Sequence, residues 1–162
     1  LTSLADLADR QMALLVDPRF SRGLPSDLVP EEAGVLHHGF KAVQITVSAL
    51  CSEMAKDCMP ASVFSRSTES HNQDTVSLGT IAARDASRAC RAGARLLATH
   101  LLAAAQAAEM RGQVDNRPAL AHCLRAVRKR SERLDGDRVL DGEIESLAED
   151  LLTGKLWEEA GA

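Results

Sequence analysis

Aromatic residues are scarce in this sequence. Its 162 residues include three phenylalanines and one tryptophan, and tyrosine is absent. A core must therefore be built from leucine, valine, isoleucine and alanine, and alanine suits helices that pack closely side by side. The alternation of apolar and polar residues that marks strands is nearly absent too. These features predict an all-α fold built as a bundle of long helices.

Other absences exclude whole classes of function. No apolar run is long enough to span a membrane and no signal-peptide pattern opens the chain, so we expect a cytoplasmic protein with no membrane partner. The formal net charge of −4 gives no overall attraction to nucleic acid. The one basic stretch, residues 125–133, is interpreted as a solvated helix face beside a loop.

A metal centre is not predicted either. The four cysteines form no Cys-x-x-Cys pair, so we expect reduced, buried thiols. They are Cys51, Cys58, Cys90 and Cys123. His37 and His38 would point about 100° apart on a helix, a poor arrangement for joint ligation, and are interpreted as helix-start residues. Residues 135–143 superficially resemble a calcium loop but lack its alternating oxygen ligands, so they are interpreted as a turn and a helix cap.

Five helices are predicted along the chain. They are expected at residues 2–16, 38–56, 72–111, 118–134 and 141–152. They form an entry helix with a crossing loop (1–35), the central long helices of the bundle (36–112) and the C-terminal helices (113–162). Pro18 and Pro60 end the first two helices, and Pro118 suits the first turn of the fourth.

The helix expected at 72–111 is too long for a small domain to cover. At about 1.5 Å per residue it would be about 60 Å long. A compact globule of this chain length has a radius of gyration of only about 15 Å. Its second half, 94–108, is apolar nearly all round, so it must be covered on most sides by its own chain or by other subunits.

Polar residues concentrate just before that helix, at 65–74. Helix capping explains part of the cluster, because Ser70, Asn72 or Asp74 could accept hydrogen bonds from free backbone N–H groups. Capping does not require Glu69, His71, Asn72 and Gln73 together. The cluster is therefore also a candidate contributor to an active site.

Several motifs carry a resemblance to a known superfamily. They are Arg10-Gln-Met-Ala-Leu-Leu-Val-Asp17, Gly23-Leu-Pro25, Gly39-Phe-Lys-Ala-Val-Gln-Ile45, Glu69-Ser-His-Asn-Gln-Asp-Thr-Val-Ser-Leu-Gly79, Ala105-Gln-Ala107 with Arg111, and Asp137-Arg138. In this order they resemble the superfamily of phenylalanine and histidine ammonia-lyases and tyrosine 2,3-aminomutase. The resemblance spans essentially the whole chain, and the segment 66–74 is closer to the tyrosine and phenylalanine branches.

This resemblance implies an all-α homotetramer whose active sites combine residues of three subunits. It also implies an electrophilic cofactor, 4-methylidene-imidazole-5-one (MIO), formed by cyclisation of an Ala-Ser-Gly tripeptide. In that family a tyrosine base removes a β-proton and ammonia leaves to give an arylacrylate. Aminomutases then add the ammonia back at the β-carbon.

Three family features are missing from the sequence. Ala61-Ser62 is followed by Val63, and Ala86-Ser87 by Arg88, so there is no Ala-Ser-Gly. The tyrosine base and the arginine motif for the substrate carboxylate are not found either. In the family these features precede the region that matches this chain. We therefore interpret the chain as the C-terminal part of an enzyme whose N-terminal segment is its necessary partner.

The resemblance carries over to four positions, and helix geometry adds a fifth. Lys41 matches the family position that lines the pocket for the aromatic ring of the substrate, and Ile45, one helical turn on, lies on the same face. Glu69 matches a carboxylate near the substrate amine, where it could stabilise or relay charge. Asn72 and Gln73 match amides near the electrophile and the base, suited to orienting other groups by hydrogen bonding.

Two hypotheses of different class follow. The first is part of an ammonia-lyase or 2,3-aminomutase for an aromatic L-amino acid, with tyrosine and the aminomutase reaction favoured. The second is a non-catalytic helical scaffold or regulatory subunit of the same fold. The absent Ala-Ser-Gly favours the second, and the intact set from Glu69 to Gln73 favours the first.

Overall fold

The computed structural model describes residues 1–112, 114 and 117–161. Six α-helices lie in this part of the chain, and it contains no β-strand. The helices are α1 (Thr2–Val16), α2 (Lys41–Lys56), α3 (Gly79–Met110), α4 (Pro118–Arg128), α5 (Asp141–Thr153) and α6 (Lys155–Ala160). The prediction of an all-α fold is confirmed.

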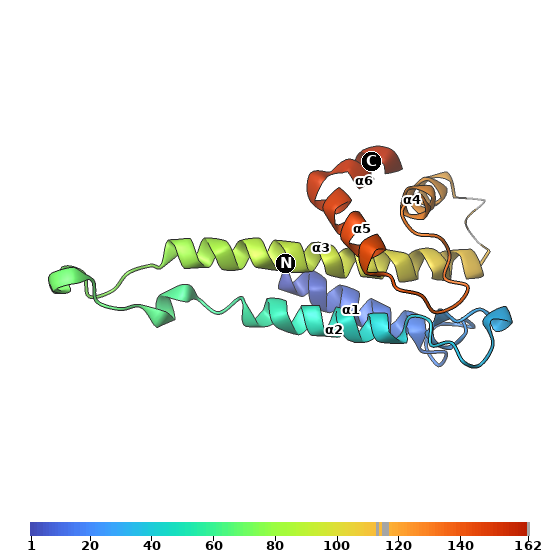
Figure 1. The fold of residues 1–162 in the computed structure, drawn as a ribbon, viewed down its shortest axis with the longest axis horizontal. Coiled ribbons are helices and arrows are strands. Elements are labelled where there is room, and N and C mark those ends of the chain that lie inside the picture. The colour runs from blue at the N-terminus through green and yellow to red at the C-terminus, as the bar shows by residue number, and fades with distance from the viewer. Residues whose placement is uncertain (113, 115–116, 162) are drawn as a thin grey trace.

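The molecule is an elongated bundle with a helical unit on one flank (Figure 1). Helices α1, α2 and α3 lie side by side along the long axis and pack on one another. Helix α5 packs on the second half of α3, and α6 joins it to α4. Aliphatic residues from most of these helices fill the shared core, including Met12, Val47, Leu96, Leu102 and Leu147, all nearly inaccessible to solvent.

Helix α3 projects beyond the helices that cover it. At about 1.5 Å per residue its 32 residues span about 48 Å, shorter than the predicted length but still too long for the bundle to enclose. Its second half is buried by α1, α2 and α5, as the apolar pattern of 94–108 requires. Its first ten residues, 79–88, remain largely exposed. The part of α3 that its own chain leaves uncovered is therefore the first half.

Three predicted boundaries are wrong. Helix α2 begins at Lys41 rather than His38, because the positive φ of Gly39 (+51°) interrupts the helical path. Helix α3 begins at Gly79 rather than 72, because Leu78 is in the left-handed region. Helix α4 ends at Arg128, not 134. Helix α6 was not predicted, and it follows the left-handed Gly154 that ends α5.

The expectation of buried cysteines holds for one residue only. Cys51 is buried between α2 and α1, and its thiol donates a hydrogen bond to the carboxylate of Asp6 (3.2 Å). Burial raises the pKa of the Cys51 thiol to about 11, so it stays protonated at neutral pH. The other three cysteines are exposed in this chain, and all four are free thiols.

An ion-pair cluster ties the C-terminal helices together. Arg130 lies just after α4, and its side chain is only 8% exposed. It pairs with Asp150 of α5 and with Glu159 of α6, each at 2.6 Å. Lys129 also reaches Glu159, at 3.1 Å. The hydrogen bonds from Arg130 and Lys129 lower the pKa of the Glu159 carboxyl from 4.5 to about 2.

This pKa gives the first prediction, on acid stability. Because the folded-state pKa of Glu159 is depressed, its contribution is present above about pH 4.5 and is lost as the pH falls towards 2. The difference in urea midpoint between the wild type and Glu159→Gln should therefore be constant above pH 4.5 and should vanish near pH 2. Glu158→Gln, on the exposed neighbour, is the control and should show little difference at any pH. If the urea midpoints of the wild type and Glu159→Gln still differ at pH 2, the prediction is contradicted.

Candidate functional site

The polar cluster 65–74 lies at the far tip of the molecule (Figure 1). It is folded as a hydrogen-bonded loop that contains the 3₁₀ turn Glu69–His71. The N–H of Val76 donates to Ser65 Oγ (2.8 Å), and the N–H of Gln73 donates to Thr68 Oγ1 (3.0 Å). The N–H groups that these bonds satisfy belong to the loop and not to the first turn of α3, for which no described side chain forms a cap. The capping explanation of the cluster is therefore wrong.

The loop presents three of the predicted site residues to solvent. Glu69, Asn72 and Gln73 are all exposed, and their side chains form no hydrogen bond with another residue that the structure describes. Two backbone positions inside the loop, Ser70 (φ +53°) and His71 (φ +56°), are left-handed. Non-glycine residues adopt this conformation at a cost, and such positions concentrate at functional sites.

The other two predicted site residues lie in the first turns of α2. Lys41 and Ile45 are exposed, Ile45 by 65% of its surface. Four residues apart, they share one face of the helix. The preceding Phe40 is only 2% exposed and anchors the start of the helix in the core.

The structure keeps these two sets apart within one chain. Helix α2 alone spans about 24 Å at about 1.5 Å per residue, and the tip loop extends further in the same direction (Figure 1). Lys41 and Ile45 therefore lie near one end of the elongated chain, and the loop with Glu69, Asn72 and Gln73 at the other. A single copy cannot bring all five residues to one small substrate.

The start of α2 is held by a contact that the sequence analysis missed. The carboxylate of Asp137 accepts hydrogen bonds from the N–H groups of His38 (3.0 and 2.9 Å) and Gly39 (2.8 Å). The N–H of Asp137 in turn donates to His37 Nδ1 (2.9 Å). These partners are about 100 residues apart, so no local pattern could reveal the contact.

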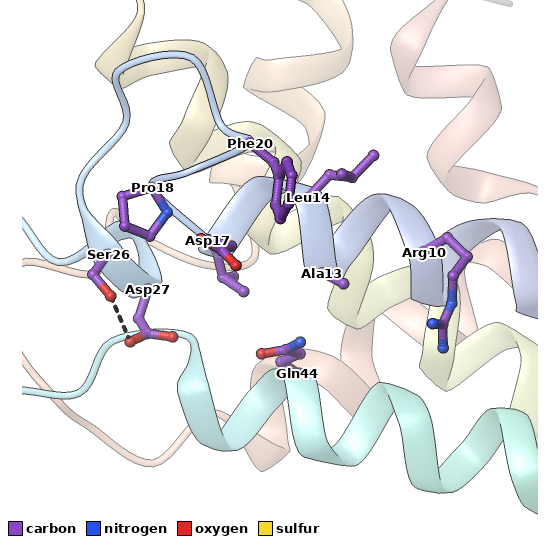
Figure 2. A pocket seen from close by; sticks show the side chains of 10 residues that line it. Arg10, Ala13, Leu14, Asp17, Pro18, Phe20, Ser26, Asp27 and Gln44 are labelled. Carbon is purple, nitrogen blue, oxygen red and sulfur yellow. Dashed lines mark hydrogen bonds between the residues drawn. The ribbon is translucent and has the colours of Figure 1, made fainter.

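An open cleft of about 590 Å³ lies between α1 and the start of α2 (Figure 2). Arg10, Asp17, Phe20, Asp27 and Gln44 are among its lining residues. It contains none of the five predicted site residues, although Gln44 adjoins Ile45. The described residues hold no group of three or more metal-ligating side chains, and none of their helices is long and apolar enough to cross a membrane.

The fold defines the class of protein first. The chain superposes on a tyrosine aminomutase from Streptomyces globisporus with a TM-score of 0.89 and 36% identity, covering 99% of this chain and 30% of that one. It superposes on histidine ammonia-lyase from Trypanosoma cruzi with a TM-score of 0.87 and 32% identity, covering 99% of this chain and 31% of that one. The architecture is therefore that of a segment of the helical ammonia-lyase and aminomutase fold.

Sequence comparison gives the family. A sequence model of the family described as aromatic amino acid lyase matches residues 1–129. A tyrosine ammonia-lyase of Cereibacter sphaeroides is 45% identical over 94% of this chain and 29% of its own length. An MIO-dependent tyrosine 2,3-aminomutase of Streptomyces globisporus is 38% identical over 96% of this chain and 29% of its own length. The chain belongs to the aromatic amino acid lyase family, and it spans about 30% of the length of these relatives.

Proposed function

We propose that this chain is the C-terminal segment of an ammonia-lyase or 2,3-aminomutase acting on an aromatic L-amino acid, with tyrosine as the expected substrate. It would catalyse this reaction only together with the N-terminal segment of the same enzyme. Membership of the family supports the reaction class. The similarity to relatives named for reactions of tyrosine supports the substrate.

The observation that carries the proposal is the exposed loop at the tip. A loop whose backbone is held by its own hydrogen bonds, while a carboxylate and two amides point to solvent, is suited to completing a site elsewhere. Lys41 and Ile45 are equally exposed at the other end. We infer that a site containing both sets is assembled between copies of the enzyme, in the homotetramer that the family resemblance implies.

Exposed apolar side chains support such an assembly. Val63 and Phe64 before the tip loop and Ile81 in the first half of α3 are all exposed in this chain. A monomer would leave these groups in water, where each forgoes the free energy of burial. Packing against other copies or the N-terminal segment removes that cost.

The side chains of the loop fit the MIO electrophile of the family. The group would come from an Ala-Ser-Gly outside this chain, and when present it supplies an electrophilic carbon for the amine of the substrate. The amides of Asn72 and Gln73 can donate and accept hydrogen bonds, so they would orient groups beside it. The carboxylate of Glu69 would hold the ammonium of the substrate or carry its proton at Oε. Lys41 and Ile45 would contact the aromatic ring.

The first experiment is to compare the intact mass of the purified protein under denaturing conditions with its native mass. We expect a polypeptide longer than this chain, or a companion polypeptide, that contains Ala-Ser-Gly and assembles as a tetramer. If this chain alone forms a stable homo-oligomer, the enzymatic proposal fails. The non-catalytic scaffold hypothesis then replaces it.

The second experiment measures the reaction. The assembled protein should convert L-tyrosine to a product with the ultraviolet absorbance of an arylacrylate, or to the β-amino acid. Lys41→Met should change the ratio of kcat/KM for tyrosine to that for histidine, since Lys41 is expected beside the ring. Lys56→Met, an exposed lysine at the end of the same helix, is the control. An assembled wild type that turns over no aromatic amino acid contradicts the proposal.

A further inference from the structure

Two segments with no assigned role meet at the start of α2. The first is the histidine pair His37 and His38. The second is the loop 131–140 between α4 and α5, which superficially resembled part of a calcium loop. Asp137 of this loop accepts three hydrogen-bond contacts from the N–H groups of His38 and Gly39, at 2.8 to 3.0 Å. The Asp137 N–H donates to His37 Nδ1, so the two segments are joined in both directions.

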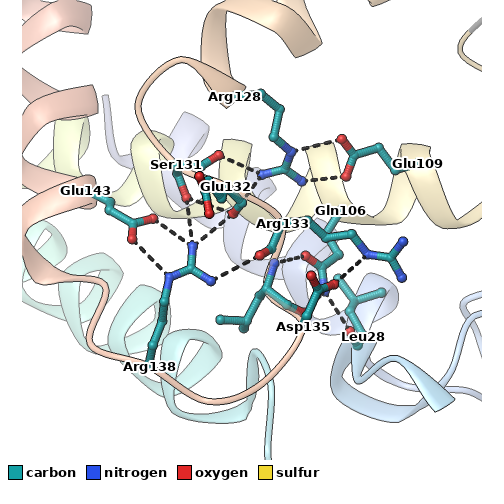
Figure 3. Close-up of polar contacts among 11 residues, drawn as sticks. Leu28, Gln106, Glu109, Arg128, Ser131, Glu132, Arg133, Asp135, Arg138 and Glu143 are labelled. Carbon is teal, nitrogen blue, oxygen red and sulfur yellow. Dashed lines mark hydrogen bonds and ion pairs between the residues drawn. The ribbon is translucent and has the colours of Figure 1, made fainter. Parts of the chain in front are cut away.

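The loop that carries Asp137 is held firmly on both sides. Leu134 exchanges hydrogen bonds with the buried amide of Gln106, at 2.8 and 2.9 Å (Figure 3). Arg138 binds Glu143 through two nitrogens, at 3.1 and 3.0 Å, and donates to the carbonyls of Glu132 and Arg133 (Figure 3). Asp137 is therefore presented from a fixed backbone and can impose a position on its partners.

Helix α2 needs such an external anchor. None of the residues at its own start provides a side-chain cap. A carboxylate close to a helix N-terminus also interacts favourably with the partial positive charge there. The hydrogen bonds from the His38 and Gly39 N–H groups lower the pKa of the Asp137 carboxyl, which keeps it ionised at neutral pH.

The anchored turn has little room to move on its other side. The N–H of Phe40 donates to the carbonyl of Asp27 (2.9 Å), and a Cβ on Gly39 would lie 2.4 Å from that same oxygen. Gly39, with φ +51°, thus donates its N–H to Asp137 on one side and lies against the Asp27 carbonyl on the other. The next residue after Phe40 is Lys41, whose side chain is exposed.

We propose that Asp137 is a positioning residue: by binding the His38 and Gly39 N–H groups it sets the first turn of α2, and with it the placement of Lys41 and Ile45 against the ring of the substrate. This inference rests on the proposed function for its consequence in catalysis. It adds to that function a distant residue that controls substrate selectivity without touching substrate. The loop 131–140 thereby becomes part of the support of the site.

The test is Asp137→Asn in the complete, assembled enzyme. The hydrogen bonds from the His38 and Gly39 N–H groups to the Asp137 carboxylate are called the clamp. Asparagine retains one acceptor oxygen but turns an NH₂ group towards these backbone donors, so part of the clamp is lost. Because small misplacements of a binding group cost up to about 100-fold in rate, we expect the ratio of kcat/KM for tyrosine to that for histidine to shift by about tenfold. Asp135→Asn makes the same chemical change on the same loop, at an exposed residue paired with Arg133, and should leave the ratio unchanged.

A milder variant protects the test against a misfolded Asp137→Asn. His37→Ala removes the acceptor for the Asp137 N–H, and with it the ring that packs on Gly136, but keeps the hydrogen bonds from His38 and Gly39 to Asp137, so it should shift the ratio in the same direction by a smaller factor. If both variants lower the rates on the two substrates equally, the role of Asp137 is structural only and the inference is overturned.

Amide hydrogen exchange separates this inference from the proposed function. Peptides covering residues 36–45 should exchange faster in Asp137→Asn than in the wild type and in Asp135→Asn. If the exchange rates of residues 36–45 are the same in Asp137→Asn as in the wild type, Asp137 does not hold the start of α2, whatever the activity of the variant. A wild type without activity on either amino acid, combined with faster exchange in Asp137→Asn, refutes the proposed function and the selectivity role but leaves the clamp established.

Discussion

Replacing Gln106 with leucine is expected to destabilise the protein by about 3–5 kcal/mol. The side chain of Gln106 is fully buried in α3 and joins two segments that are distant in sequence. Its Nε2 donates to the carbonyls of Leu28 and Leu134, both at 2.9 Å, and its Oε1 accepts the N–H of Leu134 at 2.8 Å (Figure 3).

The size of the effect follows from what the substitution leaves behind. Leucine has a similar volume, although its side chain is one bond shorter, so little space is left empty and the main cost is polar. Two carbonyls and one N–H lose their partner inside the core, and each orphaned group costs about 1–3 kcal/mol. The three costs are not strictly additive, because the loops at Leu28 and Leu134 can admit water.

Urea unfolding and thermal melting of the purified protein measure this loss. Gln11→Leu, at an exposed glutamine of α1, is the matched control and should change the midpoint little. Amide exchange should also quicken around Leu134. An unfolding midpoint for Gln106→Leu within error of the control would mean that the bridge contributes nothing to stability.

The sequence predicted the helices whose ends are marked by proline or by clear apolar spacing. Helix α1 was placed at 2–16, where the structure has it, because Pro18 limits it and its apolar residues recur at helical intervals. The start of α4 at Pro118 was predicted for the same reason. The start of α3 was misplaced, because the residues between Asn72 and Gly79 have no proline and the break depends on the left-handed Leu78.

The five residues expected at the site remain a prediction, and the sequence did not show how they are arranged. Motif resemblance picked out Lys41, Ile45, Glu69, Asn72 and Gln73 without showing that they lie at two ends of the chain. The clamp at Asp137 was missed because its acceptor and donors are separated by almost 100 residues and carry no periodic signal. Gln106 was picked out only as part of the motif Ala105-Gln-Ala107. Its bonds to two loops were visible only in the folded chain.

Replacing Glu69 with glutamine is expected to lower kcat of the assembled enzyme by about 100- to 10,000-fold, which is the factor by which a positioned general acid or base usually raises the rate. Glutamine matches the shape of glutamate but carries no charge and cannot take up a proton. In the proposed site the carboxylate of Glu69 meets the ammonium of the substrate, so both binding of the amine and transfer of its proton are affected. Because Glu69 is exposed and forms no hydrogen bond with another described residue, the fold itself should be unaffected.

The measurement is steady-state formation of arylacrylate from tyrosine, with the native mass and melting temperature of each variant recorded beside it. Asp74→Asn removes one negative charge from the same tip loop at an exposed residue and is the matched control. A general electrostatic effect of the loop would lower the rate in both variants alike. A specific role of Glu69 lowers it in Glu69→Gln alone, with an unchanged tetramer. If Glu69→Gln retains the wild-type kcat, the loop contributes no acid–base group, and only its amides at Asn72 and Gln73 remain as its part in the reaction.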